Sequence, residues 1–178
     1  DGKHTIYYEN GQKSSDGNYK DGKAVGLWTY WYENEQKKVE QNYIDGELDG
    51  KYIGWYENGK KRGEAFFKDG EENGKRTEYY ENGQLKSEKK YKDGKMEKHI
   101  LYHENGQKKE EKNYKDEQLD GKWILYYENG QIRSESNFKD GKEDGKWTRY
   151  NENRQIKWKR NYKDGELDGK WTGYNENG

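Results

Sequence analysis

A repeat of 24 residues runs through the whole chain and constrains its fold more than any other feature of the sequence. A Glu-Asn pair recurs eight times, at intervals of 24 residues except for one interval of 23. The asparagines of these pairs are Asn10, Asn34, Asn58, Asn82, Asn105, Asn129, Asn153 and Asn177. An aspartate keeps the same rhythm from Asp21 to Asp164. Periods of this length are typical of repeat proteins, in which each unit packs against its neighbours.

The repeat predicts one continuous array that covers residues 1–178. Partial units lie at residues 1–20 and 164–178, and full units lie at residues 21–44, 45–68, 69–92, 93–115, 116–139 and 140–163. The chain begins at Asp1 without a methionine or a signal peptide, so we interpret it as part of a longer protein. Its location, cytoplasmic or exported, is left open.

Each unit carries two turn signals about half a period apart. Asn-Gly and Asp-Gly are both preferred centres of two-residue type I′ turns, which need positive φ at both positions. The segments between them are rich in Tyr, Trp and Thr, and the chain contains no Pro. The sequence therefore predicts an all-β fold, an elongated single-layer antiparallel sheet of stacked β-hairpins. Helices are disfavoured because Gly and Asn recur too often.

Pairing the strands around these turns predicts a register. Around Asn34 and Glu35, Gly26 faces Tyr43, Trp28 faces Gln41, and Trp31 faces Lys38. A ring opposite Gly26 could lie over its bare backbone. Pairing around the Asp-Gly turns predicts four cross-strand ion pairs, namely Glu40–Lys51, Glu64–Lys75, Glu111–Lys122 and Glu135–Lys146. Irregularities are expected where Lys159 faces Lys170, and near Met96, where one residue is missing.

The register divides each hairpin into two faces. One face, the apolar face, collects Trp28, Tyr32, Tyr43, Leu48, Gly50, Tyr52 and Tyr56. The other face carries charged residues with a single aromatic row, and we call it the stripe face. Its predicted members include Trp31, Lys38, Glu40, Asn42, Lys51, Ile53 and Trp55.

Composition narrows the function. Hydrophobic residues make up 26% of the chain and aromatic residues 16%, which leaves too few aliphatic residues for a deep core. The 7 Trp, 18 Tyr and 3 Phe must therefore supply most of the buried apolar surface. The 35 basic and 36 acidic residues are interspersed and leave no polybasic surface for nucleic acid. The absence of Cys excludes disulfides and thiolate catalysis. The chain contains no run of 18 apolar residues, so no transmembrane segment is predicted.

The aromatic row is the main candidate for partner binding. This aromatic stripe consists of Tyr7, Trp31, Trp55, Tyr79, Tyr102, Tyr126, Tyr150 and Tyr174. Lys38 and Arg62 are predicted beside it as basic partner-binding residues. The alternative is structural, because a ladder of cation–π contacts would use the same rings without any ligand. The two interpretations are compatible.

Candidates for metal binding and catalysis are weak. His4 and His99 stand where other units have Trp, and His103 stands in a Tyr position. Four residues span about 13 Å on a strand, so His99 and His103 could not share one metal ion there. The segments 45–50 and 164–169 contain two Asp-Gly pairs each, which faintly suggests calcium, but turn chemistry explains them. We expect no enzyme, no cofactor and no metal.

The motifs resemble those of a known repeat family. Tyr79 to Gln84, Lys92 to Lys95 and Asp144 to Trp147 are similar to the variant form of the MORN repeat, found in bacterial antitoxin-like proteins. The resemblance covers every unit and implies an elongated sheet of stacked hairpins. It also implies relatives that act as antitoxins, scaffolds or surface proteins.

These observations predict a non-enzymatic module that binds a protein partner, as a scaffold, an antitoxin or immunity-like protein, or a surface protein. The alternative is a carbohydrate- or cell-wall-binding repeat, because sugars stack on exposed rings and a glycan could be the ligand. Binding to anionic lipid is least favoured, since the chain has no basic surplus.

Overall fold

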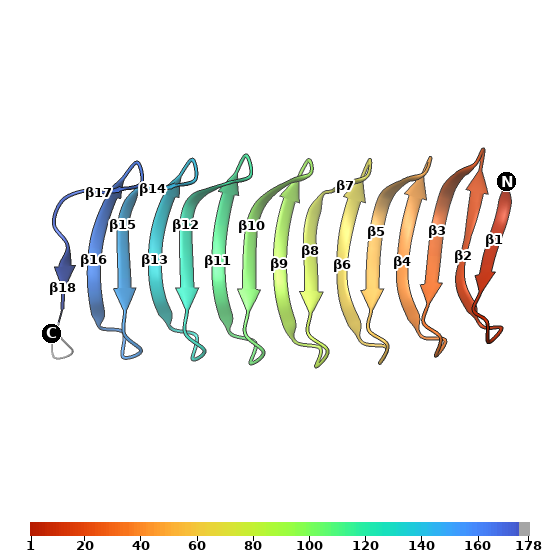
Figure 1. The fold of residues 1–178 in the computed structure, drawn as a ribbon, viewed down its shortest axis with the longest axis horizontal. Coiled ribbons are helices and arrows are strands. Elements are labelled where there is room, and N and C mark those ends of the chain that lie inside the picture. The colour runs from red at the N-terminus through yellow and green to blue at the C-terminus, as the bar shows by residue number, and fades with distance from the viewer. Residues whose placement is uncertain (175–178) are drawn as a thin grey trace. The chain divides into compact units, whose positions relative to one another are not determined.

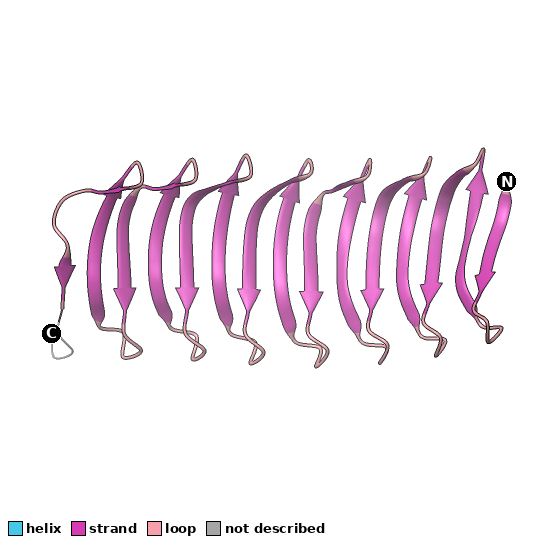
Figure 2. Ribbon diagram, in the orientation of Figure 1, coloured by secondary structure: helices cyan, strands magenta, loops and turns pink. Residues whose placement is uncertain are grey.

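The computed structural model describes residues 1–174, and it is built from antiparallel strands without a helix in that range (Figure 2). The chain divides into two compact units. The first contains residues 1–85 and 90–94, and the second contains residues 86–89 and the chain from Lys95 onward. Each unit is an open sheet of hairpins, as the sequence predicts (Figure 1). That the repeats form one continuous array stays a prediction.

Successive strands along the chain pair within each unit. The first unit contains β1 (Gly2–Tyr7), β2 (Lys13–Lys20), β3 (Lys23–Trp31), β4 (Lys37–Ile44), β5 (Glu47–Trp55), β6 (Lys61–Lys68), β7 (Glu71–Glu72) and β8 (Gly74–Tyr79). β9 (Leu85–Lys92) is divided between the units. The second contains β10 (Lys95–Tyr102), β11 (Lys108–Lys115), β12 (Gln118–Tyr126), β13 (Ile132–Lys139), β14 (Lys142–Glu143), β15 (Gly145–Tyr150), β16 (Ile156–Lys163), β17 (Glu166–Leu167) and β18 (Thr172–Gly173).

The two kinds of turn have different geometries. At the Asp-Gly turns both central residues have positive φ, for example 50° at Asp45 and 89° at Gly46, which confirms the type I′ prediction. At the Asn-Gly turns this prediction was wrong, because only the residue after Asn has positive φ, 65° at Glu35. The Glu35 N–H donates to the Tyr32 carbonyl at 3.0 Å, and the Tyr32 N–H donates to the Gln36 carbonyl at 2.9 Å. This is a three-residue loop closed by a bulge.

The bulge at the Asn-Gly turns shifts the predicted register by one residue. Gly26–Tyr43 and Trp28–Gln41 pair as predicted, but Trp31 pairs with Lys37 and not with Lys38. The shift recurs at the last residue of β1, β5, β10, β12 and β15. Sequence reasoning missed it because a two-residue loop has no room for the extra residue.

A second bulge near the Asp-Gly turns shifts the register, so the four predicted ion-pair partners do not lie directly opposite one another. Glu40 faces Ile53, and Lys51 lies two residues further along β5, because a bulge at Gly50, with φ of 100°, adds residues to that strand. Glu64, Glu111 and Glu135 face Thr77, Ile124 and Thr148 in the same way. Lys51 instead reaches Glu64 on the next strand, with its Nζ 3.6 Å from the carboxylate. Lys159 likewise faces Thr172, so the predicted clash with Lys170 does not occur.

The missing residue near Met96 has the opposite effect to the one expected. β10 runs without a break from Lys95 to Tyr102, and none of these residues has positive φ. The equivalent strands either carry a positive-φ glycine, such as Gly26, or are interrupted, as β7 and β8 are at Asn73. Deleting one residue therefore removes the bulge and leaves a regular strand.

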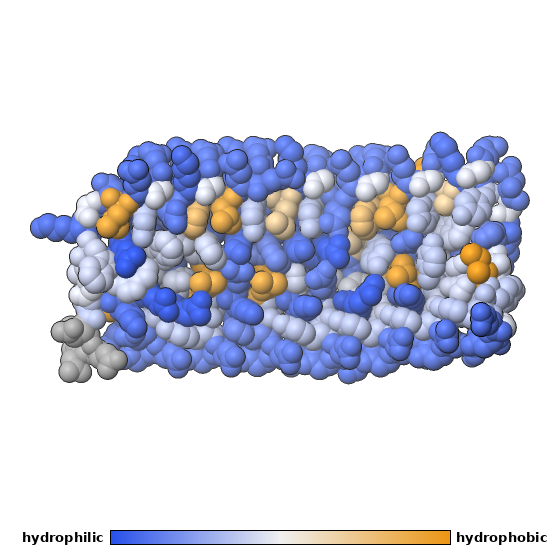
Figure 3. Space-filling model, in the orientation of Figure 1, coloured by the Kyte–Doolittle hydropathy of each residue, from blue (hydrophilic) through white to orange (hydrophobic). Residues whose placement is uncertain are grey.

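The small core lies on the apolar face. Trp28, Ala65 and Phe138 are the most buried apolar side chains, at 4%, 5% and 8% exposure. The bare backbone that receives a ring is at Gly17 and not at Gly26. A Cβ on Gly17 would lie 2.1 Å from the Trp28 ring, whereas a Cβ on Gly26 would meet nothing within 4 Å. Figure 3 shows hydrophilic residues at both turn edges and hydrophobic residues scattered between them.

Candidate functional site

The aromatic stripe residues occupy the same position in successive hairpins. In the first unit Tyr7, Trp31, Trp55 and Tyr79 end β1, β3, β5 and β8. In the second unit Tyr102, Tyr126 and Tyr150 end β10, β12 and β15, and Tyr174 follows β18. Tyr7 and Tyr174 are 57% and 40% exposed, and the other rings are half-buried. Each unit therefore presents four rings in corresponding places.

Lysines lie over several of these rings. The Nζ atom of Lys13 is 5.9 Å from the ring centroid of Trp31, and that of Lys37 is 5.9 Å from Trp55. In the second unit Lys108 lies 6.0 Å from the ring of Tyr126. Each exposed contact of this kind contributes about 0.5–1 kcal/mol. The cations beside the stripe are thus one residue earlier than predicted, because of the bulge.

The two predicted basic residues lie elsewhere. The Nζ atom of Lys38 is 5.4 Å from the ring of Tyr32, and the Arg62 guanidinium donates to the Tyr52 hydroxyl at 3.4 Å. Tyr52 belongs to the apolar face, since it pairs with Gln41 in the column of Trp28. The charged ends of Lys38 and Arg62 therefore lie at Tyr32 and Tyr52 and not over a ring of the stripe.

A row of carboxylates completes the stripe face. Lys61 donates to Glu64 at 3.1 Å, and Lys108 donates to Glu111 at 2.8 Å. The hydrogen bond from Lys61 lowers the pKa of Glu64, with burial acting against it. These pairs are largely surface interactions, and each contributes little stability on its own.

A tyrosine takes over where the lysine is missing. Ile132 stands in the lysine position three residues before Glu135, and the Tyr150 hydroxyl donates to that carboxylate at 3.2 Å. Burial and the Glu135 charge raise the pKa of Tyr150. The Tyr102 hydroxyl donates to Glu88 in the same manner at 2.7 Å. An alignment of the repeats shows an apolar residue in the lysine position at Leu85 and Ile132. It could have revealed that a tyrosine takes the place of lysine as the donor to the carboxylate there.

A second tyrosine column fixes the stripe backbone, and sequence reasoning missed it. The hydroxyl of Tyr8 donates to the carbonyl of Trp31 at 2.6 Å, and that of Tyr32 donates to the carbonyl of Trp55 at 2.9 Å. The bond recurs from Tyr56 to Tyr79 and from Tyr127 to Tyr150. At these four positions the Tyr that precedes Glu-Asn therefore ties its hairpin to the next one. At His103 the shorter ring leaves its buried Nε2 without a hydrogen-bond partner.

The histidines and paired aspartates have structural roles. The ring of His4 packs against Tyr19 at 5.5 Å, and His99 Nε2 lies 3.2 Å from the Ser87 hydroxyl. Ser87 is only 2% exposed, so a substrate could not reach this pair. Asp49 accepts a hydrogen bond from the Asp69 N–H at 3.3 Å. Within residues 1–174 no group of three His, Asp or Glu residues could hold a metal ion.

The sequence of these hairpins matches a known family of repeats. The model of the MORN repeat variant matches residues 1–21, 24–45, 48–69, 72–93, 98–116 and 119–140. The chain belongs to this family. Its repeats are generally non-enzymatic modules for interaction with proteins or membranes. No curated protein matches the chain significantly. Across the described part of the chain, no helix is long and apolar enough to span a membrane.

The apolar face of the MORN repeats carries separate side-chain clusters in the two units. In the first, Trp28 packs against Tyr19 with ring centroids 5.0 Å apart. In the second, Trp147 packs against Trp158 at 6.0 Å, and the Arg160 guanidinium lies 4.7 Å from the Trp158 ring. The hairpins therefore continue beyond residue 140, where the family match ends.

Charged residues interrupt the aromatic columns of the apolar face in the first unit. Arg76 stands in the column of Trp28 and donates to Glu78 at 2.8 Å and also to Glu72. Burial raises the pKa of the neighbouring Tyr91 to about 12, with the Glu72 carboxylate adding to the effect. The MORN repeat thus tolerates an ion cluster in place of a ring on this face.

Proposed function

We propose that this array of variant MORN repeats binds a segment of another protein on its stripe face, as a scaffold or as an antitoxin-like neutralising protein. The observation that carries the proposal is the row of half-exposed rings at equivalent positions of successive hairpins. Tyr and Trp are enriched among residues that dominate interface energies. The partner-binding residues are those of the aromatic stripe.

The contacts around the rings support this role. Lysines over the rings and hydrogen bonds from the second tyrosine column hold the stripe in place before a partner arrives. A surface that is already ordered loses less conformational entropy on binding. The alternating Lys and Glu side chains add charge complementarity, which favours a partner of matching charge pattern.

Carbohydrate binding is the weaker candidate for the same surface. Sugars stack on the open face of a ring, but lysine Nζ atoms lie 5.9 Å over the rings of Trp31 and Trp55. A sugar would have to displace a cation from each ring. A protein segment can instead use the ring edges together with the charged side chains.

The experiment compares Trp31→Ala/Trp55→Ala with the wild type. Immobilised protein is exposed to a soluble extract of the source organism, retained proteins are identified, and the dissociation constant of each is measured with purified material. Loss of the two rings should weaken binding by at least about 2 kcal/mol, as expected for interface hot spots. Urea unfolding of the same variants reports stability, where each lost cation–π contact accounts for about 1 kcal/mol or less.

Tyr52→Ala on the apolar face is the matched control and should retain the partner. Unchanged binding by the stripe variant together with a large loss of stability would show that the rings only support the sheet. If binding to sugars on a glycan array requires Trp31 and Trp55, while capture of proteins from the extract does not, the carbohydrate alternative is favoured.

A further inference from the structure

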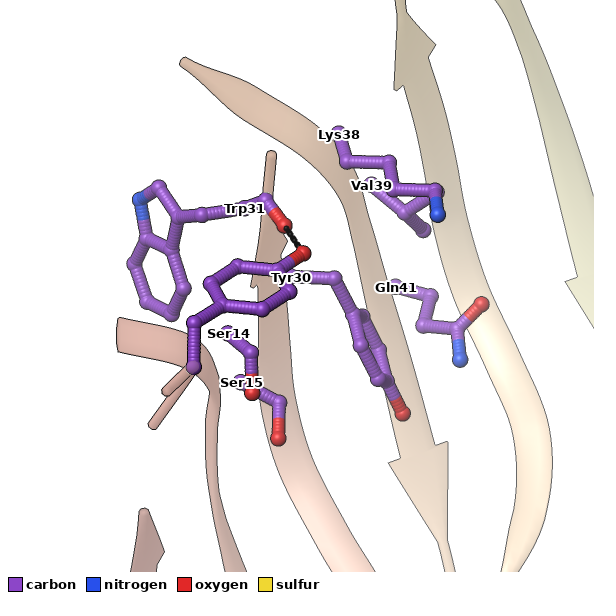
Figure 4. A pocket seen from close by; sticks show the side chains of 8 residues that line it. Ser14, Ser15, Tyr30, Trp31, Lys38, Val39 and Gln41 are labelled. Atoms are coloured by element: carbon purple, nitrogen blue, oxygen red, sulfur yellow. Dashed lines mark hydrogen bonds between the residues drawn. The ribbon is translucent and has the colours of Figure 1, made fainter. Parts of the chain in front are cut away.

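A pocket of about 370 Å³ lies in the first unit, and Tyr8 and the stripe residue Trp31 are among the residues that line it. Its lining includes Ser14, Ser15, Tyr30, Lys38, Val39 and Gln41. Tyr30 packs against Trp28 and pairs in register with Val39, which places the pocket on the apolar face. Figure 4 shows the Trp31 indole directed away from Tyr30 and Gln41.

The pocket exists because the first hairpin departs from the repeat. Ser14 stands where the later hairpins carry a long basic residue, namely Lys38, Arg62, Lys86, Lys109, Arg133 and Lys157. Two repeats further on, Arg62 lies over Gly54 of its own hairpin, with its Nη2 3.2 Å from where a Cβ would be. The short side chain of Ser14, which lines the pocket, fills less space than the long basic side chain of the later repeats.

The lining of this space carries a single charged group, the ammonium group of Lys38. Lys38 forms no ion pair within residues 1–174, and its ammonium group contacts only the ring of Tyr32 among aromatic groups there. The hydroxyls of Ser14 and Ser15 form no hydrogen bond in that range either. No acidic residue lines the pocket. The site therefore offers one positive charge and the hydroxyl of Ser14 to a ligand, whereas Ser15 is buried at 5% exposure.

The walls of the pocket are fixed by bonds that a ligand need not break. The Tyr8 hydroxyl donates to the Trp31 carbonyl at 2.6 Å, which closes one side (Figure 4). The Gln41 amide donates to the Tyr43 hydroxyl at 2.5 Å on the other side. Val39 and the ring of Tyr30 supply apolar surface next to the charge. A ligand with a short apolar stem and an anionic end fits this arrangement.

We propose that this pocket binds the carboxylate of an acidic side chain, Asp or Glu, from a protein partner. Hydrogen bonds between an ammonium group and a carboxylate are stronger than those between neutral groups, so the charge of Lys38 selects the ionised acid over its amide. A protein source fits the family, whose repeats mediate interactions. Trp31 belongs both to the stripe and to the pocket lining, but this inference rests on Lys38 and Ser14, so it does not depend on the proposed function.

The test uses capped tripeptides, Gly-Glu-Gly and Gly-Gln-Gly, titrated into isotope-labelled protein and followed by amide shifts. The Glu peptide should shift the amides of Ser14, Ser15, Lys38 and Gln41, and the Gln peptide should bind at least tenfold more weakly. Lys38→Met and Ser14→Lys should each weaken binding of the Glu peptide at least tenfold. Ser14→Lys restores the residue type of the other repeats, so it should fold even if Lys38→Met does not.

Two control variants separate this pocket from the rest of the molecule. Lys109 occupies the repeat position of Lys38, but the preceding repeat has Lys86 where the pocket has Ser14. Lys109→Met should therefore leave binding of the Glu peptide unchanged. Trp55→Ala, on the stripe, should also leave it unchanged. Equal binding of the Glu and Gln peptides, or unchanged binding by Ser14→Lys, would overturn the proposal. Binding of methyl glucuronide without binding of the Glu peptide would assign the pocket to an acidic sugar instead.

Discussion

At the scale of single residues, the bare backbone of Gly17 decides how the first hairpins pack. Trp28 lies directly over it and is only 4% exposed, while its ring also contacts Tyr19 and Tyr43. A side chain at position 17 would have to push this ring out of its cluster. The packing of the most buried tryptophan therefore depends on an absent side chain.

Gly17→Ala should lower the free energy of unfolding by about 1–3 kcal/mol, the usual cost of overpacking. Intrinsic preference acts in the other direction, because Ala is better than Gly within a strand by about 0.5–1 kcal/mol. Urea unfolding of Gly17→Ala, Trp28→Leu and the double variant would measure the coupling. If Gly17→Ala stabilises the protein, the ring does not lie where the structure has it.

Tyr91 predicts how stability responds to alkaline pH. Burial raises its pKa from 10.0 to about 12 in the folded chain, so folding favours the neutral phenol. Its contribution is fully present below pH 10 and is lost as the pH rises towards 12. Tyr91→Phe should therefore show a smaller fall in unfolding free energy over this range. The remaining fall comes from other tyrosines whose pKa burial raises, such as Tyr43 and Tyr114. Identical pH profiles for variant and wild type would contradict this assignment.

At the scale of elements, the Asn-Gly turns set the register and can be tested by exchange. Glu35 holds φ of 65° where Gly11 and Gly59 stand in other repeats. A left-handed conformation of this kind costs a non-glycine residue about 1–2 kcal/mol. Glu35→Gly should therefore raise the urea midpoint by the equivalent of about 1 kcal/mol. Gly11→Ala should lower it by a similar amount, because Gly11 has φ of 84°. Backbone strain is the only cost there, since a Cβ at Gly11 meets nothing within 4 Å. Opposite signs would refute the three-residue loop.

The exchange of lysine for tyrosine on the stripe face gives a second prediction for an element. Ile132→Lys should place an ammonium group three residues before Glu135, as Lys108 stands before Glu111. The new cation should compete with the Tyr150 hydroxyl for the carboxylate and lower the pKa of Tyr150. Nuclear magnetic resonance titration of Tyr150 would detect the change, while stability should move by no more than about 0.5 kcal/mol. An unchanged titration would mean that the pairing is not interchangeable.

Much of each element could be predicted from the sequence. The 24-residue period, the type I′ turn at Asp45 and Gly46, and the Gly26–Tyr43 and Trp28–Gln41 pairs all follow from turn chemistry and alternation. The bulges did not follow, because an Asn-Gly pair suits both a two-residue turn and a three-residue loop. The stripe was found as a column of rings, but the one-residue shift moved its cations from Lys38 to Lys37.

At the scale of the whole molecule, each unit is held together by contacts between neighbouring hairpins. The core has few deeply buried side chains, and each strand pairs with the strands next to it in the chain. In such an array, stability is approximately a sum over repeats and their interfaces. Elements with one short pairing should open first. β18 is one of them, since it pairs only through Thr172 and Gly173.

Amide hydrogen exchange of the free chain tests this account most directly. The account predicts slow exchange in the central strands of each unit, such as β3–β6 and β11–β13. It predicts fast exchange in β17 and β18, and minima of protection at both kinds of turn that recur with the 24-residue period. Local opening free energies then rise from the end strands towards the middle of each unit. Uniform protection along the chain, or protection that runs unbroken across the Asn-Gly turns, would contradict an array of stacked hairpins.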